Sequence, residues 1–377
     1  MTGAVPTDIR IPPVLLPADG RFGSGPSKVR PDAVAVLASL GTTLLGTSHR
    51  QAPVRALVRR LRDGLSELFA LPDGYQVVLG NGGSTLFWDV ATFGLIERRS
   101  QHVSFGEFSS KFAAAASAAP HLERPDVIEV PAGTAGAPRA EAGVDLYALT
   151  HNETSTGVVT DLRRPEGADD GALVAVDATS AAGGVRFDPE QVDVYYFAPQ
   201  KGFASDGGLW VAALSPAALE RVARIAASGR WVPASLDLSI AVAQSALDQT
   251  YNTPALATLV LMVDQLEWML AGGGLEWSAG RCDRSAEILY RWAESSAYAA
   301  PFVAKPDERS PVVGTIDLEG VDALTVSAVL RANGVVDTES YRKLGRNQVR
   351  VGMFPAVDPS DVEALTACID HVVTALS

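Results

Sequence analysis

The chain alternates short apolar runs with longer segments whose apolar residues recur every three or four positions. Unbroken runs of β-branched, aliphatic and aromatic residues predict buried strands, and the amphipathic segments between them predict helices. Strands that alternate with helices indicate an α/β fold with a mostly parallel sheet flanked by helices. Strands are expected at residues 75–79, 103–105, 127–130, 145–150, 173–176, 194–197 and 208–214, and helices at 31–40, 52–69, 84–93, 112–119 and 256–271.

The pattern changes after three consecutive glycines at 272–274. A helix is expected at 275–297, strands at 312–316 and 348–352, and a last helix at 359–376 with Asp358 as its N-cap. We therefore expect an extended segment (1–25), a large domain (26–268) and a smaller C-terminal α+β domain (269–377).

Composition excludes several classes of protein. The net charge of −13, from 31 basic and 44 acidic residues, argues against nucleic acid or an anionic membrane as the main partner. The helix at 256–271 contains Asp264 and Glu267, so it is expected in a core or interface and not in a membrane. Cys282 and Cys368 are far apart, the start lacks a signal-peptide pattern, and no histidines have metal-ligand spacing. A cytoplasmic protein without a metal site is expected.

The stretch Asp193-Val-Tyr-Tyr-Phe-Ala-Pro-Gln-Lys-Gly202 combines a strand with an abrupt stop. Pro199 cannot extend the ladder and Gly202 permits a bend, which leaves Lys201 at the end of a buried strand. Desolvation favours the neutral amine, and a neutral amine condenses with aldehydes to a Schiff base. A single loop lysine is usually solvated, so this interpretation depends on the residues expected near it.

Asp177 ends the apolar run at 173–176, where a carboxylate needs a partner. An N-cap, a core hydrogen bond or a cation such as a pyridinium nitrogen would each supply one. Ligands of such sheets bind beyond the carboxyl ends of the strands. Asp177 and Lys201 are therefore expected to face one crevice.

Other strand ends carry polar groups. Asn81-Gly-Gly-Ser-Thr85 opens a helix and could bind an anion through backbone N–H groups, although a simple chain-reversing turn explains its glycines equally well. Asn152-Glu-Thr154 ends another strand, and Phe108 offers a flat aromatic face. His49-Arg50 and Arg350 could bind anionic groups.

In this order and at these strand ends, the motifs resemble the class V, fold-type I pyridoxal phosphate-dependent aminotransferases, and within them the phosphoserine aminotransferase family. The resemblance extends from Phe22-Gly-Ser-Gly-Pro-Ser27 to Arg350-Val-Gly-Met-Phe354. It is most specific at four motifs, which are Ala198-Pro-Gln-Lys-Gly202, His151-Asn-Glu-Thr154, Ser48-His-Arg50 and Tyr251-Asn-Thr-Pro254.

The resemblance implies a role for each candidate residue. Lys201 would form the Schiff base with the cofactor and move protons, and Asp177 would pair with the pyridinium nitrogen. Phe108 would stack on the ring where the family usually has tryptophan, and Thr154 would bond its phenolic oxygen. The cofactor phosphate would be held by Gly83, Ser84, Gln200 and, from the other subunit of a homodimer, Asn252 and Thr253. The anionic groups of the substrate would be held by His49, Arg50 and Arg350.

The implied reaction passes an amino group between glutamate and 3-phosphohydroxypyruvate, giving O-phosphoserine and 2-oxoglutarate in serine biosynthesis. A phosphorylated hydroxythreonine of vitamin B6 synthesis is a related substrate. The alternatives are a class V aminotransferase for a non-phosphorylated oxo acid, a cysteine desulfurase, and a non-enzymatic α/β protein that binds anions at Asn81-Gly-Gly. A desulfurase needs a mobile cysteine, and neither Cys282 nor Cys368, both in predicted helices, suits that role.

Two departures from the family pattern leave a question open. Some members carry a histidine–arginine pair where this chain has Tyr341-Arg-Lys343 and Arg346, so Arg342, Lys343 or Arg346 could make the histidine's contact. The phosphate turn reads Gly-Gly-Ser-Thr where many relatives have alanine or arginine.

Overall fold

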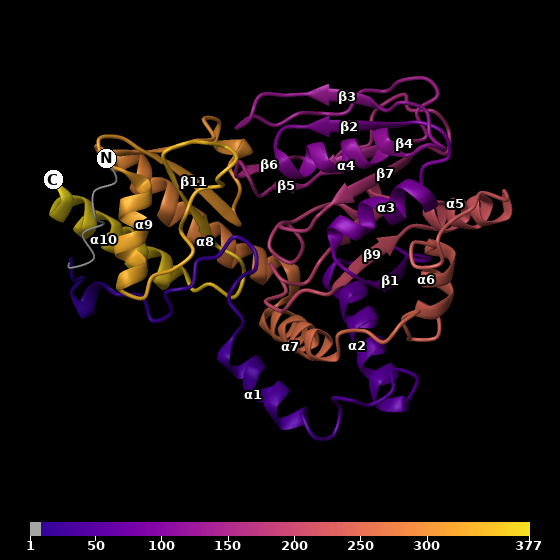
Figure 1. Cartoon of the computed structure of the whole chain (residues 1–377), viewed down its shortest axis with the longest axis horizontal. Helices are drawn as coiled ribbons and strands as arrows, with labels where there is room; N and C mark the ends of the chain where they lie inside the picture. Colours follow the sequence, from indigo (N-terminus) through magenta and orange to yellow (C-terminus); the bar gives the residue numbers. More distant parts are fainter. Residues whose placement is uncertain (1–8) are drawn as a thin grey trace.

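The computed structural model describes residues 9–377, so the first eight residues of the expected N-terminal segment lie outside the described part. Figure 1 shows two units side by side, a larger one built around a twisted sheet and a smaller one that contains the C-terminus. Each unit has its own hydrophobic cores, two flanking the large sheet and one in the smaller unit.

The large sheet has seven strands in the order β1-β9-β8-β7-β4-β2-β3. Six of them run in the same direction, and β9, which is antiparallel to its neighbours β1 and β8, runs in the opposite one. The bounds are β1 Gln76–Asn81, β2 Ser100–Ser104, β3 Asp126–Glu129, β4 Leu146–Thr150, β7 Leu173–Asp177, β8 Val194–Phe197 and β9 Leu209–Leu214. Thr150 pairs with Asp177 and Asp177 with Tyr196, so the carboxyl ends of β4, β7 and β8 are level.

Helices cover both faces of this sheet because its strands are apolar on both sides. Val174 and Val176 of β7 belong to the core under α2 and α7, whereas Leu173 and Ala175 belong to the core under α3, α4, α5 and α6. Successive strand residues point to opposite faces, which produces this division. The bounds are α1 Pro31–Leu40, α2 Ala52–Leu68, α3 Ser84–Gly94, α4 Glu107–Ala118, α5 Pro216–Ala227, α6 Leu238–Ser245 and α7 Leu256–Gly272.

The smaller unit is an antiparallel sheet, β10-β11-β12, packed against helices. Its elements are α8 Gly274–Ser295, β10 Ala299–Pro301, β11 Val313–Leu318, α9 Ala323–Ala332, β12 Gln348–Gly352 and α10 Pro359–Leu376. A hairpin of two short strands, β5 Asn152–Glu153 and β6 Val158–Val159, lies in the larger unit, and 3-10 turns occur at η1 Pro13–Leu15, η2 Pro189–Gln191 and η3 Pro306–Glu308.

The N-terminal segment packs on the smaller unit before it reaches the larger one. Phe22 is fully buried in the core of the smaller unit. Its N–H donates to the Val336 carbonyl over 3.2 Å, and its carbonyl accepts from Gly352 N–H over 2.8 Å. α8 also reaches both units, since Cys282 belongs to the core between the large sheet and α2 and α7, and Leu289 belongs to the core of the smaller unit. The domain boundary at 268/269 stays a prediction.

The hydrophobic pattern located most elements closely. α1, β12 and α10 have the expected bounds, and Asp358 accepts from Ser360 N–H at the start of α10. α5, α6, α9, β10 and the β5–β6 hairpin were not anticipated. Within residues 9–377 no single helix is long and apolar enough to cross a membrane, although α7 and α8, bent by 91°, pass that test as a pair.

Candidate active site

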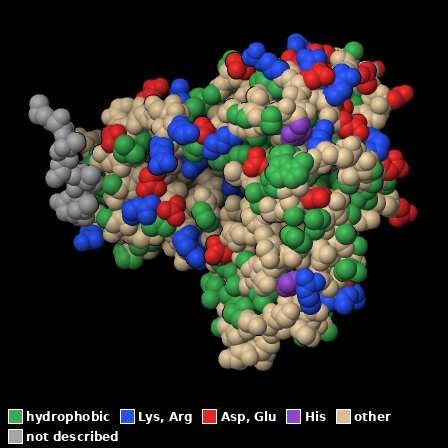
Figure 2. Space-filling model, turned by 45° about the vertical axis from the view of Figure 1, so that its right-hand side comes forward, with side chains coloured by type: hydrophobic (Ala, Val, Ile, Leu, Met, Phe, Trp, Pro, Cys, Tyr) green, Lys and Arg blue, Asp and Glu red, His purple; other side chains and the backbone are tan. Residues whose placement is uncertain are grey.

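A cavity of about 290 Å³ lies beyond the carboxyl ends of β4 and β7, between the two units. In Figure 2, Lys and Arg side chains gather over the smaller unit and around a hollow between the units, despite the net charge of −13. The cavity is lined by Ser24, Gly25, Pro26, Gly83, Ser84, Thr85, Trp88, Phe108, Thr150, Asn152, Thr154, Asp177, Thr179, Ser180, Gln200, Lys201, Tyr341 and Arg350.

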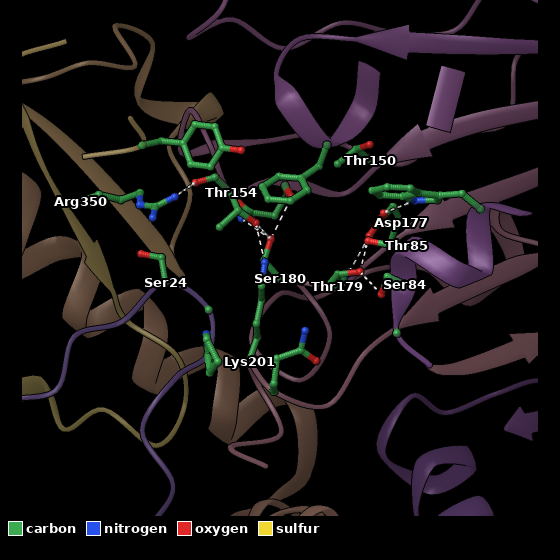
Figure 3. Close-up of a pocket in the computed structure, with 18 residues that line it drawn as sticks. Ser24, Ser84, Thr85, Thr150, Thr154, Asp177, Thr179, Ser180, Lys201 and Arg350 are labelled. Atoms are coloured by element: carbon green, nitrogen blue, oxygen red, sulfur yellow. Dashed lines mark hydrogen bonds between the residues drawn. The ribbon is translucent and has the colours of Figure 1, made fainter. Parts of the chain in front are cut away.

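Lys201 follows β8 and extends into the centre of the cavity (Figure 3). Its Nζ donates to Thr154 Oγ1 over 2.9 Å and lies 5.2 Å from the centroid of the Phe108 ring. Burial lowers the pKa of Lys201 from 10.5 to about 8, so about a tenth of the amine is neutral at pH 7. Two glycines permit this position, because a Cβ on Gly202 would lie 2.1 Å from the Ala182 carbonyl oxygen and one on Gly25 would lie 2.6 Å from Lys201 Cε.

Asp177 lies on the opposite side of Lys201 from Arg350 (Figure 3). Its Oδ2 accepts from Trp88 Nε1 over 3.0 Å, and its Oδ1 accepts from the N–H and the hydroxyl of Thr179 over 3.0 and 2.6 Å. Among the described residues no basic side chain forms an ion pair with it. Neutral donors therefore stabilise a carboxylate that can still accept a positively charged ligand.

The N-terminus of α3 also faces the cavity. Gly83 is its N-cap and Ser84 its first residue, and the Ser84 hydroxyl is hydrogen-bonded to Thr179 over 2.6 Å. Apart from Gly83 itself and its neighbours in the chain, no heavy atom of residues 9–377 lies within 4 Å of the point where a Cβ of Gly83 would stand. Free first-turn N–H groups, the helix dipole and this open space together form a suitable place for a phosphate.

Phe108 is held over Lys201 by a buried carboxylate. Glu153 is fully buried. Its carboxylate accepts from the N–H groups of Phe108 and Ser109 at the start of α4, and from the hydroxyl of Ser109 and the hydroxyl of Ser155. Gly106 leaves room for it, since a Cβ there would lie 2.3 Å from Glu153 Cγ. Glu153 therefore fixes the start of α4 and with it the aromatic side of the cavity.

Arg350 of β12 forms the opposite wall. Its Nη1 donates to the Thr154 carbonyl over 3.3 Å, and its Nε is buried without a hydrogen-bond partner. Burial lowers the pKa of this guanidinium. Within residues 9–377 no carboxylate lies within 4.0 Å of it, so the wall offers an uncompensated positive charge for an anion.

The structure brings most of the predicted site residues to this cavity. Those that line it are Lys201, Asp177, Gly83, Ser84, Phe108, Thr154, Gln200 and Arg350. The other four do not line it. They are grouped elsewhere, with Thr253 Oγ1 3.2 Å from His49 Nδ1, Arg50 Nη1 3.2 Å from Gln249 Oε1, and Asn252 beside them in the chain.

None of the three basic residues considered for the missing histidine lines the cavity. Lys343 pairs with Glu107, Arg346 pairs with Asp317, and Arg342 is exposed. Tyr341 lines it instead. Sequence reasoning also missed Trp88, Thr179 and Ser180, of which the last two could have been found as polar residues directly after Asp177.

The cavity fits pyridoxal phosphate. Four buried polar atoms that have no hydrogen-bond partner among the described residues belong to its lining, namely Ser24 Oγ, Asn152 Oδ1, Gln200 Oε1 and Arg350 Nε. An amine, a carboxylate, an aromatic face and a helix N-terminus are the groups that an aldehyde, a ring nitrogen, a ring and a phosphate require. The described residues contain no cluster of three or more His, Cys, Asp or Glu that could hold a metal ion.

Residues 134–365 match the family model described as Aminotransferase class-V. A phosphoserine aminotransferase from a Nocardioides species is 65% identical over 367 residues, which cover 97% of this chain and 98% of the relative.

Solved structures share the fold. A phosphoserine aminotransferase from Cytophaga hutchinsonii superposes with a TM-score of 0.86 at 22% identity, covering 93% of this chain and 99% of that one. A phosphoserine aminotransferase from Trichomonas vaginalis with bound pyridoxal phosphate has a TM-score of 0.79 at 18% identity, covering 93% and 99%. With the cavity as described, these findings show that the chain belongs to the phosphoserine aminotransferase family of class V, pyridoxal phosphate-dependent aminotransferases.

Proposed function

We propose that the chain transfers the amino group of glutamate to 3-phosphohydroxypyruvate, giving O-phosphoserine and 2-oxoglutarate. The observation that carries this proposal is Arg350, a largely buried guanidinium at the cavity wall with an unpartnered Nε. A carboxylate bound there by the planar fork of arginine would satisfy both its charge and its open donor. Both proposed substrates carry such a carboxylate.

The cofactor would be held by residues that surround Lys201. Gly83, Ser84 and Gln200 would bind its phosphate, Asp177 its ring nitrogen, Thr154 its phenolic oxygen and Phe108 one face of its ring. Bound in this way, the group supplies a protonated ring that accepts electrons from the substrate carbon during amino transfer.

The side chains of this protein would handle the protons and the orientation. Lys201, with a pKa of about 8, can take a proton from the substrate Cα and return one, because its pKa lies close to neutral pH. Asp177 keeps the ring nitrogen protonated by offering a stabilised carboxylate. Arg350 fixes the substrate carboxylate, and the ring of Phe108 excludes water from one side.

We further propose that the group formed by His49, Arg50, Asn252 and Thr253 completes the site of the partner subunit in a homodimer. The group lies outside its own cavity, and Asn81 Nδ2 donates to the Thr253 carbonyl over 2.8 Å. Exposed apolar residues stand nearby in the chain, with exposed fractions of 40% at Leu45, 52% at Leu247 and 49% at Tyr251. Exposed apolar residues bordered by polar ones are typical of a subunit contact. Arg50 would there bind the substrate phosphate.

Serine biosynthesis in the cytoplasm is the setting that these substrates imply. The phosphorylated hydroxythreonine of vitamin B6 synthesis has the same pair of anionic groups, so we propose it as a second substrate of the same site.

A substrate panel tests the proposed reaction. The purified holoenzyme is assayed with glutamate and either 3-phosphohydroxypyruvate or plain hydroxypyruvate, and in the reverse direction with 4-phosphohydroxythreonine and 2-oxoglutarate. Formation or consumption of 2-oxoglutarate is followed by a coupled assay. We expect kcat/KM for 3-phosphohydroxypyruvate to exceed that for hydroxypyruvate by about 100-fold or more, since the phosphate adds charge-assisted hydrogen bonds. Equal values would support the non-phosphorylated alternative and overturn the proposal.

A further inference from the structure

Tyr341 occupies the gap between Arg350 and Phe108. The centroid of its ring lies 5.3 Å from Arg350 Cζ and 6.0 Å from the centroid of the Phe108 ring, with the two aromatic planes tilted by 56°. The ring of Tyr341 therefore contacts the positive wall of the cavity on one side and its aromatic wall on the other.

Little else among the described residues holds the guanidinium of Arg350. Its single hydrogen bond, to the Thr154 carbonyl, is long at 3.3 Å, and its Nε has no partner. An arginine side chain has many rotamers, and ordering them for two-pronged binding costs entropy. The cation–π contact with the partly buried ring of Tyr341 is a second restraint on its orientation.

The loop that carries Tyr341 is itself anchored to the larger unit. Lys343 pairs with Glu107 at the start of α4, one residue before Phe108, and Lys111 pairs with the same carboxylate over 3.2 Å. Leu344 N–H donates to the Tyr341 carbonyl over 2.9 Å and closes a turn. The ring is thus held against Arg350 from both units.

We infer that Tyr341 is a positioning residue that orients Arg350 for the substrate carboxylate, an inference that rests on the proposed role of Arg350. The ring performs this function, and the hydroxyl does not. Tyr341 thereby fills the place that a basic residue was expected to fill, acting through Arg350 and not as another charge.

The glutamate half-reaction tests this inference without any phosphorylated substrate. Holoenzyme is mixed with glutamate alone, and the change in cofactor absorbance gives a half-saturating concentration and a maximal rate. We expect Tyr341→Phe to stay within about twofold of the wild type, and Tyr341→Leu to raise the half-saturating concentration about tenfold with a maximal rate within about threefold. Titration of the apoprotein with pyridoxal phosphate should give equal affinities for all three proteins.

A double-mutant cycle shows whether Tyr341 acts through Arg350. In an Arg350→Ala background, Tyr341→Leu should change half-saturation by less than about twofold. Tyr298→Leu is the matched control, because this tyrosine of the smaller unit bonds Asp370 and does not line the cavity. Thermal unfolding shows whether leucine on the loop disturbs folding. If it does, Tyr341→Gln, a second variant without the ring, replaces Tyr341→Leu in these measurements.

Three outcomes would overturn the inference: wild-type behaviour of both variants that lack the ring, equal damage from Tyr341→Phe and Tyr341→Leu, or an undiminished effect in the Arg350→Ala background. If the wild type responds to glutamate and Tyr341→Leu weakens that response, yet 3-phosphohydroxypyruvate is not turned over, the inference stands while the proposed function fails.

Discussion

The hydroxyl of Thr154 donates to Ser180 Oγ over 2.8 Å and therefore presents only lone pairs to Lys201 Nζ, 2.9 Å away. Ser180 in turn donates to the Asn152 carbonyl over 2.9 Å, so the donor and the acceptor are fixed in each of these hydrogen bonds. Lys201 is consequently held by an acceptor that suits both its neutral and its protonated form. The position of the lysine is thus independent of its charge, while burial controls its pKa.

Uptake of pyridoxal phosphate by the apoprotein should follow the pKa of Lys201. Only the neutral amine attacks the aldehyde, so the rate constant should rise with pH and level off above a midpoint near 8, where an ordinary lysine would still be rising towards 10.5. About a tenth of Lys201 is neutral at pH 7 by this value. Stopped-flow absorbance between pH 6 and 10 measures the profile, and a midpoint above 10 would contradict it.

The same shift predicts how Lys201 affects the stability of the apoprotein. Its pKa is lower in the folded state than in the unfolded chain, so the unfolded state binds more protons and stability rises with pH between about 8 and 10.5. Below pH 8 the full free-energy cost of burying the protonated amine is present. Lys201→Met should therefore stabilise the apoprotein at pH 7 by roughly 1–3 kcal/mol, and the difference should shrink as the pH approaches 10. The free energy of unfolding in urea, measured for both proteins at pH 7 and pH 10, checks the stabilisation and its decrease with pH.

Asp177 should depend on its neutral donors. Thr179→Val removes the 2.6 Å hydroxyl contact, and we expect kcat to fall by about tenfold because a carboxylate with one donor fewer is more basic and competes with the ring nitrogen for its proton. Thr179→Ser keeps the hydroxyl and should stay within about threefold of the wild type. The pH dependence of cofactor absorbance is the second readout, and a Thr179→Val spectrum identical to the wild type would contradict this role.

Glu153 should contribute more to stability than its lack of charged partners suggests. Glu153→Gln places an NH₂ group among donors at the start of α4, and we expect a loss of about 1–3 kcal/mol in the free energy of unfolding. The affinity for pyridoxal phosphate should also decrease, because Phe108 moves with the helix. Glu107→Gln is the control, since that carboxylate is partly exposed and pairs with Lys343 and Lys111 at the surface.

Hybrid dimers test the proposed sharing of sites. Arg50→Ala and Arg350→Ala homodimers should each have low kcat/KM. If Arg50 acts in the partner's site, a hybrid of the two has one intact site, so random reassortment of the subunits restores about a quarter of wild-type activity. If Arg50 acted within its own chain, every site would carry one substitution and no activity would return.

The residues that the sequence revealed are those that local chain features place. Lys201 and Asp177 end apolar runs that could only be buried strands, and Gly83 opens a helix directly after a strand, so all three are local signals. Ser215 with Pro216, and Asp322 with Thr325, were equally local cap signals for α5 and α9 that were overlooked.

Other site residues depend on packing that no local pattern encodes. Trp88 is one of several apolar residues on α3, and only the approach of α3 to β7 brings its N–H to Asp177. Tyr341 lies in a loop between α9 and β12 and reaches the cavity because the smaller unit packs against the start of α4. Charge alone favoured Arg342, Lys343 and Arg346, whereas the fold turns an uncharged ring towards the cavity.

The segment at residues 22–28 is fastened at both ends. Phe22 is embedded in the core of the smaller unit, and Lys28 pairs with Asp361 of that unit over 3.4 Å. Between them, Ser27 donates to the carbonyls of Gln200 and Lys201, and Gly25 abuts the lysine side chain. The segment therefore connects the smaller unit to the backbone that carries the reactive lysine. Because these bonds join residues from both units, the integrity of this one short stretch of backbone bears on the position of Lys201 as well as on the packing of the smaller unit.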